Sequence, residues 1–403
     1  MTDLSHLKAD FPILEDGVHF LDSGASSQKP LVVVEAMSRF AQTSYANVHR
    51  GAYRLSVAAT DAYEAARERV ARFIGSSDSR QVIFTRGTTT ALNSVAFGWG
   101  MEHLSEGDRI ISTEMEHHSN LVPWQMVAKR TGARLDHIPV TDDFRLDLDA
   151  FSRMIDSDVR IVSITGMSNV LGTMPPIREF AEIAHGVGAR LVVDAAQLVP
   201  HSPVDVEASG ADFMAFSGHK MLGPTGIGVL WGRMDALEEM EPFEGGGEMI
   251  ADVTLHDATW APIPTRFEAG TPPIIQAIGL HAAVDYLDSV GMDKVLDHDR
   301  ALTEIALHRL GDVPGLSVQG PTTIENRGGV ISMVMDGVHA HDLSTILDQQ
   351  GVSVRAGHHC AKPLMRRMGV AATARASFYL YNDESDIDAL VTGLRQARDL
   401  FGL

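Results

Sequence analysis

Short runs of apolar, β-branched residues recur along the chain up to residue 232, and each has the length of a buried strand. The runs are QVIFT (81–85), RIIST (109–113), RIVSIT (160–165), RLVVDAA (190–196), ADFMAFS (211–217) and GIGVLWG (226–232). Most are separated by segments such as TTALNSVAFGWGM, where apolar residues recur every three or four positions, the spacing of an amphipathic helix. This alternation predicts an α/β fold with a parallel or mostly parallel sheet covered on both faces.

The pattern changes after residue 270. TPPIIQAIGLHAAVDYLDSV (271–290) opens with prolines at a plausible helix start and then carries apolar positions on one face, so it predicts a helix able to bridge two domains. Beyond it, GGVISMVMDG, GVSVR and ARASFYLYN have the composition of strands, and HDLSTILDQQ and SDIDALVTGLRQARDL that of helices. These elements predict a compact α+β unit.

Composition excludes several classes of protein. A formal net charge of -20 repels phosphate backbones, so we expect no nucleic-acid partner. The start MTDLSHLKADF lacks the features of a secretory signal, and apolar runs such as LVVVEAM are too short for a membrane span. A single cysteine cannot form an internal disulfide and fits a reducing compartment, so we expect a cytoplasmic protein with no membrane partner.

Two charged residues follow predicted strands at the sheet edge where open α/β folds bind ligands. Asp194 ends the strand in ARLVVDAAQ, and its buried carboxylate needs a partner, for which a protonated pyridine nitrogen is one candidate. Capping of the next turn is the alternative. Lys220 lies in the glycine-rich loop SGHKMLGPTGIG, where a desolvated amine could form a Schiff base, although most lysines are solvated surface residues.

Two further turns carry candidate ligands. In TRGTTTALN, Gly87 and the threonines at 88–90 lie between a strand and a helix start, where free amides and the helix dipole favour a phosphate; an ordinary helix cap is the alternative. In EMEHHSN, His117 and His118 follow the second strand. A histidine there could stack on an aromatic cofactor and move protons, although most histidines at strand ends do neither.

The only cysteine lies in RAGHHCAKP, residues 355–363. Zinc would need three or four converging ligands, and side chains alternate in an extended segment, so His358, His359 and Cys360 cannot all face one ion. A buried structural cysteine is a second interpretation. The polar and basic neighbours favour a third, a nucleophile, because nearby cations favour the reactive thiolate.

Together, in this order and spacing, the motifs resemble one family. SGHKM, DAAQ, RGTTTALN, EHHSN, NVHRGAYRLS, RFEAGTPP and RAGHHCAKP…ATARASFYLYN resemble the SUF-type, group II cysteine desulfurases of the class V aminotransferase family, over nearly the whole chain. The resemblance implies the fold-type I architecture of pyridoxal-phosphate enzymes, with a mostly parallel seven-stranded sheet. It implies a large cofactor-binding domain at 15–285 and a small α+β domain at 286–403 that carries the cysteine loop, with residues 1–14 packing on the small domain.

The resemblance also assigns cofactor contacts. Lys220 matches the lysine that binds pyridoxal 5'-phosphate covalently and later takes the Cα proton of the substrate. Asp194 matches the partner of the pyridine nitrogen, Gln197 the residue that bonds the phenolic oxygen, and His117 the histidine that stacks on the ring and takes part in catalysis. The phosphate contacts are Thr88, Thr89, Ser217 and His219.

The remaining matched residues belong to the substrate and to the second subunit. Arg375 matches the arginine that clamps the substrate carboxylate through a bidentate fork, and Asn169 matches a residue near both the ring and that carboxylate. His49 and Arg355 are further candidates for substrate binding. Thr271 matches a residue that reaches the cofactor phosphate of the partner subunit. No metal is implied.

The activity implied is conversion of L-cysteine to L-alanine by a homodimer, with the sulfur left on Cys360 as a persulfide for iron–sulfur cluster assembly. An acceptor protein of the SufE or SufU type is implied, and we hypothesise that His341 in HAHD faces it; a surface histidine at a helix start is the alternative. A selenocysteine lyase would carry the same constellation. An aminotransferase or kynureninase-like carbon–carbon lyase needs Lys220 and Asp194 but no thiol, and a non-catalytic scaffold needs none of them.

Overall fold

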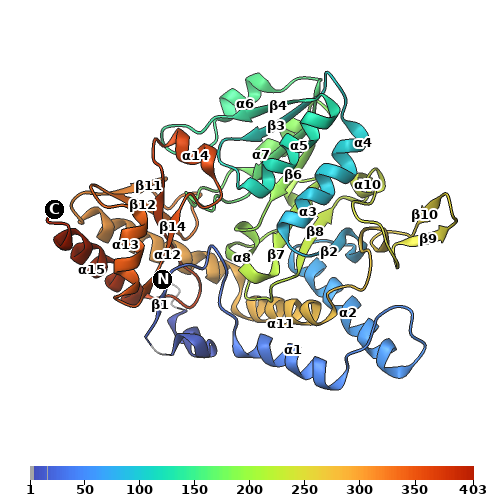
Figure 1. Ribbon diagram of the computed structural model, residues 1–403, viewed down its shortest axis with the longest axis horizontal. Coiled ribbons are helices and arrows are strands. Elements are labelled where there is room, and N and C mark those ends of the chain that lie inside the picture. Colours follow the sequence, from blue (N-terminus) through green and yellow to red (C-terminus); the bar gives the residue numbers. More distant parts are fainter. Residues whose placement is uncertain (1–3, 16) are drawn as a thin grey trace.

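A seven-stranded sheet forms the centre of the larger part of the molecule (Figure 1). The computed structural model describes residues 4–15 and 17–403; residues 1–3, part of the segment predicted to pack on the small domain, lie outside this range, as does residue 16 of the predicted large domain. The strand order is β2-β8-β7-β6-β5-β3-β4, and only β8 runs antiparallel to its neighbours. The strands are β2 Val82–Thr85, β3 Arg109–Thr113, β4 Arg134–Ile138, β5 Val159–Thr165, β6 Arg190–Asp194, β7 Phe213–Ser217 and β8 Gly228–Gly232.

The helices lie on both faces of this sheet and around the C-terminal part of the chain (Figure 1). Their bounds are α1 Leu31–Thr43, α2 Arg54–Phe73, α3 Thr88–Val95, α4 Met101–His103, α5 Val122–Thr131, α6 Leu148–Met154, α7 Ile177–His185, α8 Leu198–His201, α9 Val206–Ser209, α10 Met234–Glu238, α11 Ile274–Val290, α12 Met292–Gly311, α13 Ala340–Asp348, α14 Lys362–Arg367 and α15 Glu384–Leu400. Among the described residues, no helix combines the length and apolar character needed to cross a bilayer. The prediction of an α/β fold with a mostly parallel sheet is confirmed.

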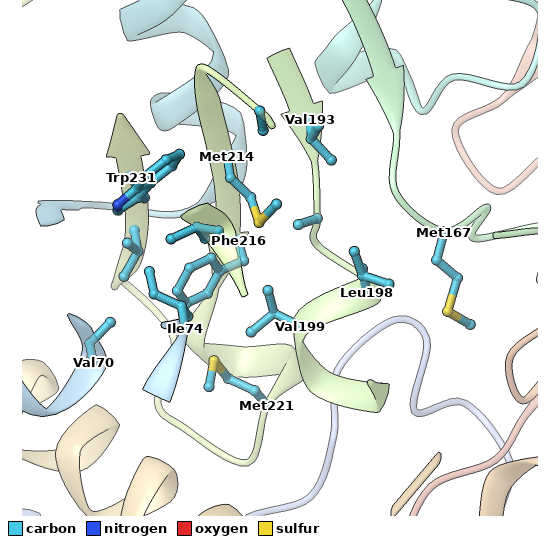
Figure 2. Packing of buried hydrophobic residues seen from close by; sticks show 14 of the residues in the cluster. Val70, Ile74, Met167, Val193, Leu198, Val199, Met214, Phe216, Met221 and Trp231 are labelled. Carbon is cyan, nitrogen blue, oxygen red and sulfur yellow. The ribbon is translucent and has the colours of Figure 1, made fainter. Parts of the chain in front are cut away.

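Successive side chains of each central strand enter two different apolar layers. Leu191 and Val193 of β6 pack in the layer that contains α2, α7 and α11, whereas Val192 packs in the opposite layer with α3 and α5. Figure 2 shows the first layer, where side chains from β6, β7 and β8 lie beside the end of α2. Because both faces are buried, these strands are continuous apolar runs in the sequence.

A second, four-stranded antiparallel sheet lies in the C-terminal part of the chain. Its order is β11 Leu316–Gln319, β12 Val330–Met335, β15 Thr373–Ser377 and β14 Arg355–Gly357. The N-terminal segment joins this part, because β1 (His19–Phe20) pairs with β13 (Val352–Ser353) and Asp22 bridges to Ser377. The N-terminal segment therefore lies beside β13 and β15 in the C-terminal part of the chain.

Three local features differ from the sequence pattern. The strand predicted over ARASFYLYN ends at Ser377, because Phe378 to Tyr381 leave the sheet while staying buried. The strand β4 was not expected, since it lies at the sheet edge and has only one fully buried residue, Ile138. The hairpin of β9 (Ile250–Val253) and β10 (Ala258–Trp260) was not predicted either, because its residues are largely exposed and show no apolar run.

Candidate active site

A cavity opens at the carboxyl ends of the parallel strands, with roughly 820 Å³ of empty space including its mouth. Of the fourteen residues predicted for the site, twelve line it: Thr88, Thr89, His117, Asn169, Asp194, Gln197, Ser217, His219, Lys220, Arg355, Cys360 and Arg375. We call the part around Asp194, Ser217 and Lys220 the cofactor end. The part around Arg355, Cys360 and Arg375 is called the substrate end.

Asp194 is the last residue of β6, and its side chain is 4% exposed. One carboxylate oxygen accepts a hydrogen bond from the N–H of Ala196 at 3.0 Å. Burial raises the pKa of Asp194, while the nearby Lys220 ammonium opposes that rise. A carboxylate in this position is stabilised in its charged form by a cation, and a protonated pyridine nitrogen is such a cation.

Lys220 ends the 3-10 turn η6 (Gly218–Lys220), directly after β7. Burial lowers the pKa of its amine from 10.5 to about 8, although Asp194 acts in the opposite direction. A lysine with this pKa has a sizeable neutral fraction near neutral pH, and the neutral amine is the nucleophilic form. Lys220 is therefore able to bond covalently to an aldehyde and to accept a proton.

Hydroxyl groups gather at the N-terminus of α3. The N–H of Thr88 donates to Ser217 Oγ at 2.8 Å, and the hydroxyls of Thr89 and Ser119 lie 2.7 Å apart. The strand β8 approaches closely here, because Gly228 has no side chain: a Cβ at this residue would lie 2.5 Å from Gly87 Cα. Free amides, hydroxyls and the positive end of the helix dipole together suit a phosphate dianion.

His117 stands at the start of the 3-10 turn η5 (His118–Asn120), and its Nδ1 accepts the N–H of Ser119 at 3.0 Å. Burial, with Lys220 as the next cause, lowers the pKa of His117 to about 3, so the ring is neutral at working pH. Because Nδ1 is an acceptor, the proton of the neutral ring lies on Nε2. The ring offers a flat face and one N–H donor to the cavity.

Three residues of the cavity wall carry buried polar atoms that have no hydrogen-bond partner within the described chain. These atoms are Gln197 Oε1, His359 Nδ1 and Arg375 Nε. Buried polar atoms are normally paired, and all three belong to residues that line the same cavity, so bound polar groups would complete its wall. The residues present therefore fit a phosphorylated pyridine cofactor at one end and an amino-acid carboxylate at the other.

Arg375 lies on β15, 2% exposed, directly across the sheet from Arg355 of β14. Its guanidinium donates to the Asn169 carbonyl at 2.9 Å and to Asp22 at 3.0 Å, and Arg355 donates to the other Asp22 oxygen at 3.3 Å. Like charges directly opposite each other repel, and Asp22 offsets that repulsion. Two guanidinium groups and one carboxylate leave one positive charge, which one substrate carboxylate would neutralise.

Cys360 lies on the loop between β14 and α14, and its side chain is exposed. Its exposure does not fit a buried structural cysteine. The preceding residue is held by Asn169, whose side-chain amide donates to the His359 carbonyl at 2.7 Å. Within residues 4–15 and 17–403, no group of three or more histidine, cysteine, aspartate or glutamate side chains is arranged to hold a metal ion.

Two predicted residues lie outside this cavity. His49 precedes α2 and its ring bonds Glu64 at 2.9 Å. Thr271 lines a second hollow together with Thr85 and Thr90. The resemblance assigns Thr271 to the cofactor of a partner subunit. A residue with that role need not line the cavity of its own subunit. The roles of both residues stay predictions.

Sequence reasoning did not identify two residues that organise the site. Asp22 has no local signal, because its arginine partners are more than 300 positions away. Glu116 is buried and accepts hydrogen bonds from Thr113, Asn120 and the N–H of Thr165, at 2.7, 2.7 and 2.8 Å. Glu116 therefore ties the end of β3 to the end of β5, next to Asp194, although the motif EMEHHSN marks only the histidines.

The sequence of this chain is similar to those of known enzymes along its whole length. The model of a family described as aminotransferase class-V matches residues 19–390. The chain belongs to this class-V aminotransferase family. A probable cysteine desulfurase of Streptomyces coelicolor is 50% identical, over 100% of this chain and 99% of its own length. A cysteine desulfurase of Haloferax volcanii is 49% identical, over 99% and 98%.

Solved structures of cysteine desulfurases agree with this placement. The cysteine desulfurase CsdA from Escherichia coli, in an S-sulfonic acid form, has a TM-score of 0.93 at 39% identity and covers 99% of both chains. An apo cysteine desulfurase from Thermococcus onnurineus has a TM-score of 0.95 at 39% identity, over 100% of this chain and 99% of its own. By these relationships the protein is a pyridoxal-phosphate enzyme of the cysteine desulfurase group, as the motifs predicted.

Proposed function

We propose that this class-V enzyme is a SUF-type, group II cysteine desulfurase that converts L-cysteine to L-alanine and keeps the sulfur on Cys360. One observation carries the proposal: an exposed thiol shares a cavity with the Lys220 amine and the Asp194 carboxylate. An aminotransferase or a kynureninase-like lyase needs the last two groups but leaves Cys360 without a role. The relatives named cysteine desulfurase support the same choice.

The residues of the cofactor end suit pyridoxal 5'-phosphate. When bound, this cofactor supplies an electron sink for the pair left behind when a Cα proton departs. Asp194 would hold the protonated ring nitrogen and Gln197 the phenolic oxygen, while Thr88, Thr89, Ser217 and His219 would hold the phosphate. The Lys220 amine holds the cofactor between turnovers and takes the Cα proton of the substrate. Neutral His117 presents its ring face and one N–H.

The sulfur step uses Cys360. Its thiolate attacks the substrate sulfur, so that a sulfur–sulfur bond forms and the bond between substrate Cβ and sulfur breaks. The electron pair of the broken bond stays on the carbon skeleton, which takes up protons and leaves as L-alanine. The step needs no added oxidant or reductant, because the carbon gains the pair that the sulfur gives up. Arg375 and Arg355, held by Asp22, bind the substrate carboxylate.

A homodimer is part of the proposal. Apolar side chains that are about half exposed gather on α1 and around the start of α2: Leu31, Val32, Val34, Tyr45, Tyr53, Leu55 and Val57. A patch of this kind is typical of a surface covered by another protein. Thr271 lies outside its own cavity, which supports a role at the cofactor of the partner subunit.

The persulfide then supplies an acceptor protein of the SufE or SufU type for iron–sulfur cluster assembly in the cytoplasm. His341 supports a docking place for that acceptor, because it is exposed at the start of α13 and its ring stacks on His339 at 5.4 Å. The helix α13 packs against β14, the strand that leads into the Cys360 loop. The His341→Ala enzyme should lose acceptor stimulation but keep its activity without acceptor; unchanged stimulation would contradict this role.

The decisive experiment for the proposed function is steady-state turnover of cofactor-loaded protein with L-cysteine. We expect L-alanine and sulfide in the wild type, and loss of both in Cys360→Ser with the absorbance of the bound cofactor retained. Alanine release by Cys360→Ser at the wild-type rate would refute the proposal. Parallel assays with L-selenocysteine separate this function from a selenocysteine lyase, which would prefer the selenium substrate.

A further inference from the structure

The Cys360 loop has a backbone conformation that its own residues do not favour. His359 and Cys360 are consecutive non-glycine residues with positive φ, 48° and 56°. Residues other than glycine adopt this left-handed conformation rarely, and it persists where surrounding contacts hold it. The position of the Cys360 thiol therefore depends on those contacts.

His118 supplies two of these contacts, at the carbonyl of Cys360 and at the amide of the residue that begins α14. Its backbone N–H donates to the Cys360 carbonyl at 2.7 Å. Its ring Nε2 accepts the backbone N–H of Lys362, the first residue of α14, at 3.1 Å. One residue of the turn after β3 thus binds the loop both at the cysteine and at the helix that follows it.

Other hydrogen bonds also hold the loop, among them a turn across the cysteine in which the N–H of Ala361 donates to the His358 carbonyl at 2.9 Å. Asn169 holds the carbonyl of His359, and His358 Nδ1 accepts the N–H of Cys360 at 3.2 Å. The rings of His118 and His358 also lie 5.8 Å apart. The His118 ring accepts the amide at the start of α14, so loss of the ring removes this bond and leaves the backbone bond to the Cys360 carbonyl in place.

The contact with Lys362 requires a neutral His118 ring, because a protonated imidazole has no free acceptor nitrogen. The charged and titratable groups that face this ring are His358 and Lys362 across the contact and His117 beside it. Burial, followed by His358 and Lys362, lowers the pKa of His118. Burial, His358 and Lys362 therefore all favour the neutral ring, which is the form that can accept this bond.

We propose that His118 is a positioning residue for sulfur transfer: through the Lys362 amide and the Cys360 carbonyl it fixes the thiol of Cys360 toward the cavity. This role rests on the proposed function, in which Cys360 attacks the substrate sulfur. His118 touches neither substrate nor cofactor in this account. It acts through the loop, and its ring acceptor is what a substitution can remove.

The test compares His118→Leu with His118→Gln in the cofactor-loaded enzyme. Leucine has no acceptor, whereas the glutamine carbonyl oxygen can take the place of Nε2. In single turnover with L-cysteine we expect persulfide formation about tenfold slower in His118→Leu, the loss of one hydrogen bond, and most of the rate restored in His118→Gln. The absorbance of the bound cofactor and the KM for L-cysteine should stay within twofold. His308→Leu, an exposed histidine on α12, is the matched control.

Hydrogen exchange at the Lys362 amide gives a second measurement that needs no turnover. We expect exchange to be several-fold faster in His118→Leu and close to wild type in His118→Gln. Equal transfer rates in wild type and His118→Leu, a glutamine variant as slow as leucine, or unchanged exchange would each overturn the proposal. If the wild type makes no persulfide, the proposed function fails, and the exchange experiment still decides the contact. His118→Asn, whose side chain is too short to reach Lys362, replaces the leucine variant if that variant does not fold.

Discussion

At the cofactor end, Asp194 and Ser217 are the last residues of adjacent strands in a buried sheet, whereas at the substrate end Cys360 stands on a loop with left-handed backbone. The position of Asp194 follows from the pairing of β6 with its neighbours and from the two apolar layers that cover the strand. The position of Cys360 depends on hydrogen bonds between its loop and residues distant in sequence, such as His118 and Asn169. The comparison teaches that the chemistry common to this fold lies on the sheet, while the chemistry specific to sulfur is added by a loop.

The largest effect should come from Lys220→Ala, which removes the amine that bonds the cofactor and takes the Cα proton. We expect activity with L-cysteine to fall about a thousandfold or more, together with loss of the absorbance of the lysine-bound cofactor. Absorbance spectra and alanine release measure the two losses. A Lys220→Ala enzyme with normal absorbance would show that the cofactor end is assigned wrongly.

Asp194→Asn should have the next largest effect, because asparagine cannot balance the charge of a protonated pyridine nitrogen. Activity should fall on the order of a hundredfold, while Lys220 still binds the cofactor and the thiol of Cys360 keeps its reactivity toward an alkylating reagent. Kinetics, cofactor affinity and alkylation rate separate these effects. If the alkylation rate of Cys360 changed as much as the activity, the position of the thiol would depend on the cofactor end, contrary to the comparison above.

Asp22→Asn tests the substrate end alone. Without the carboxylate, Arg375 and Arg355 repel each other and lose the group that orients both guanidinium planes. We expect KM for L-cysteine to rise about fivefold, kcat to change less, and the cofactor absorbance to stay constant. A KM that falls would mean that the added positive potential, rather than the orientation of the clamp, dominates carboxylate binding.

Glu116→Gln should give the smallest effect, seen in stability against pH. Burial raises the pKa of Glu116 from 4.5 to about 8, so between these values the folded protein holds a proton that the unfolded chain has released. The stability that Glu116 contributes is therefore fully present below pH 4.5 and is lost as pH rises toward 8. Wild type minus variant Tm should shrink by a few degrees between pH 5 and 8.

The matched control for this measurement is Glu106→Gln, on an exposed turn of the same part of the chain. Its difference from the wild type should be independent of pH over that range. A constant Tm difference for Glu116→Gln would show that this carboxylate is ionised throughout, and that its hydrogen bonds outweigh the effect of burial.

The cofactor end could be predicted well from the sequence, because Asp194 ends an apolar strand and Lys220 and His117 stand shortly after one. The carboxyl ends of parallel strands meet at one edge of the sheet, so residues at these strand ends are expected to lie close together. Asp194, Ser217, Lys220 and His117 line one cavity, as this predicts. The group II placement, the domain boundaries at 285 and 286 and the individual roles stay predictions.

The substrate end could be predicted only in its residue types. Cys360 and its basic neighbours are visible in RAGHHCAKP, but the left-handed backbone and the contact with His118 are set by a segment more than 200 positions away. Asp22 lies further still from Arg375 and carries no motif of its own. Contacts of this kind depend on how separate elements pack, and hydrophobic periodicity does not record them.

The most direct test of the central claim is a single turnover of cofactor-loaded enzyme with L-cysteine, followed by mass analysis of the peptide that contains Cys360. We predict that this peptide gains one sulfur atom in an amount equal to the L-alanine released, and that a reductant removes the gain. L-alanine formed without sulfur on Cys360, or sulfur held elsewhere on the chain, would contradict the account.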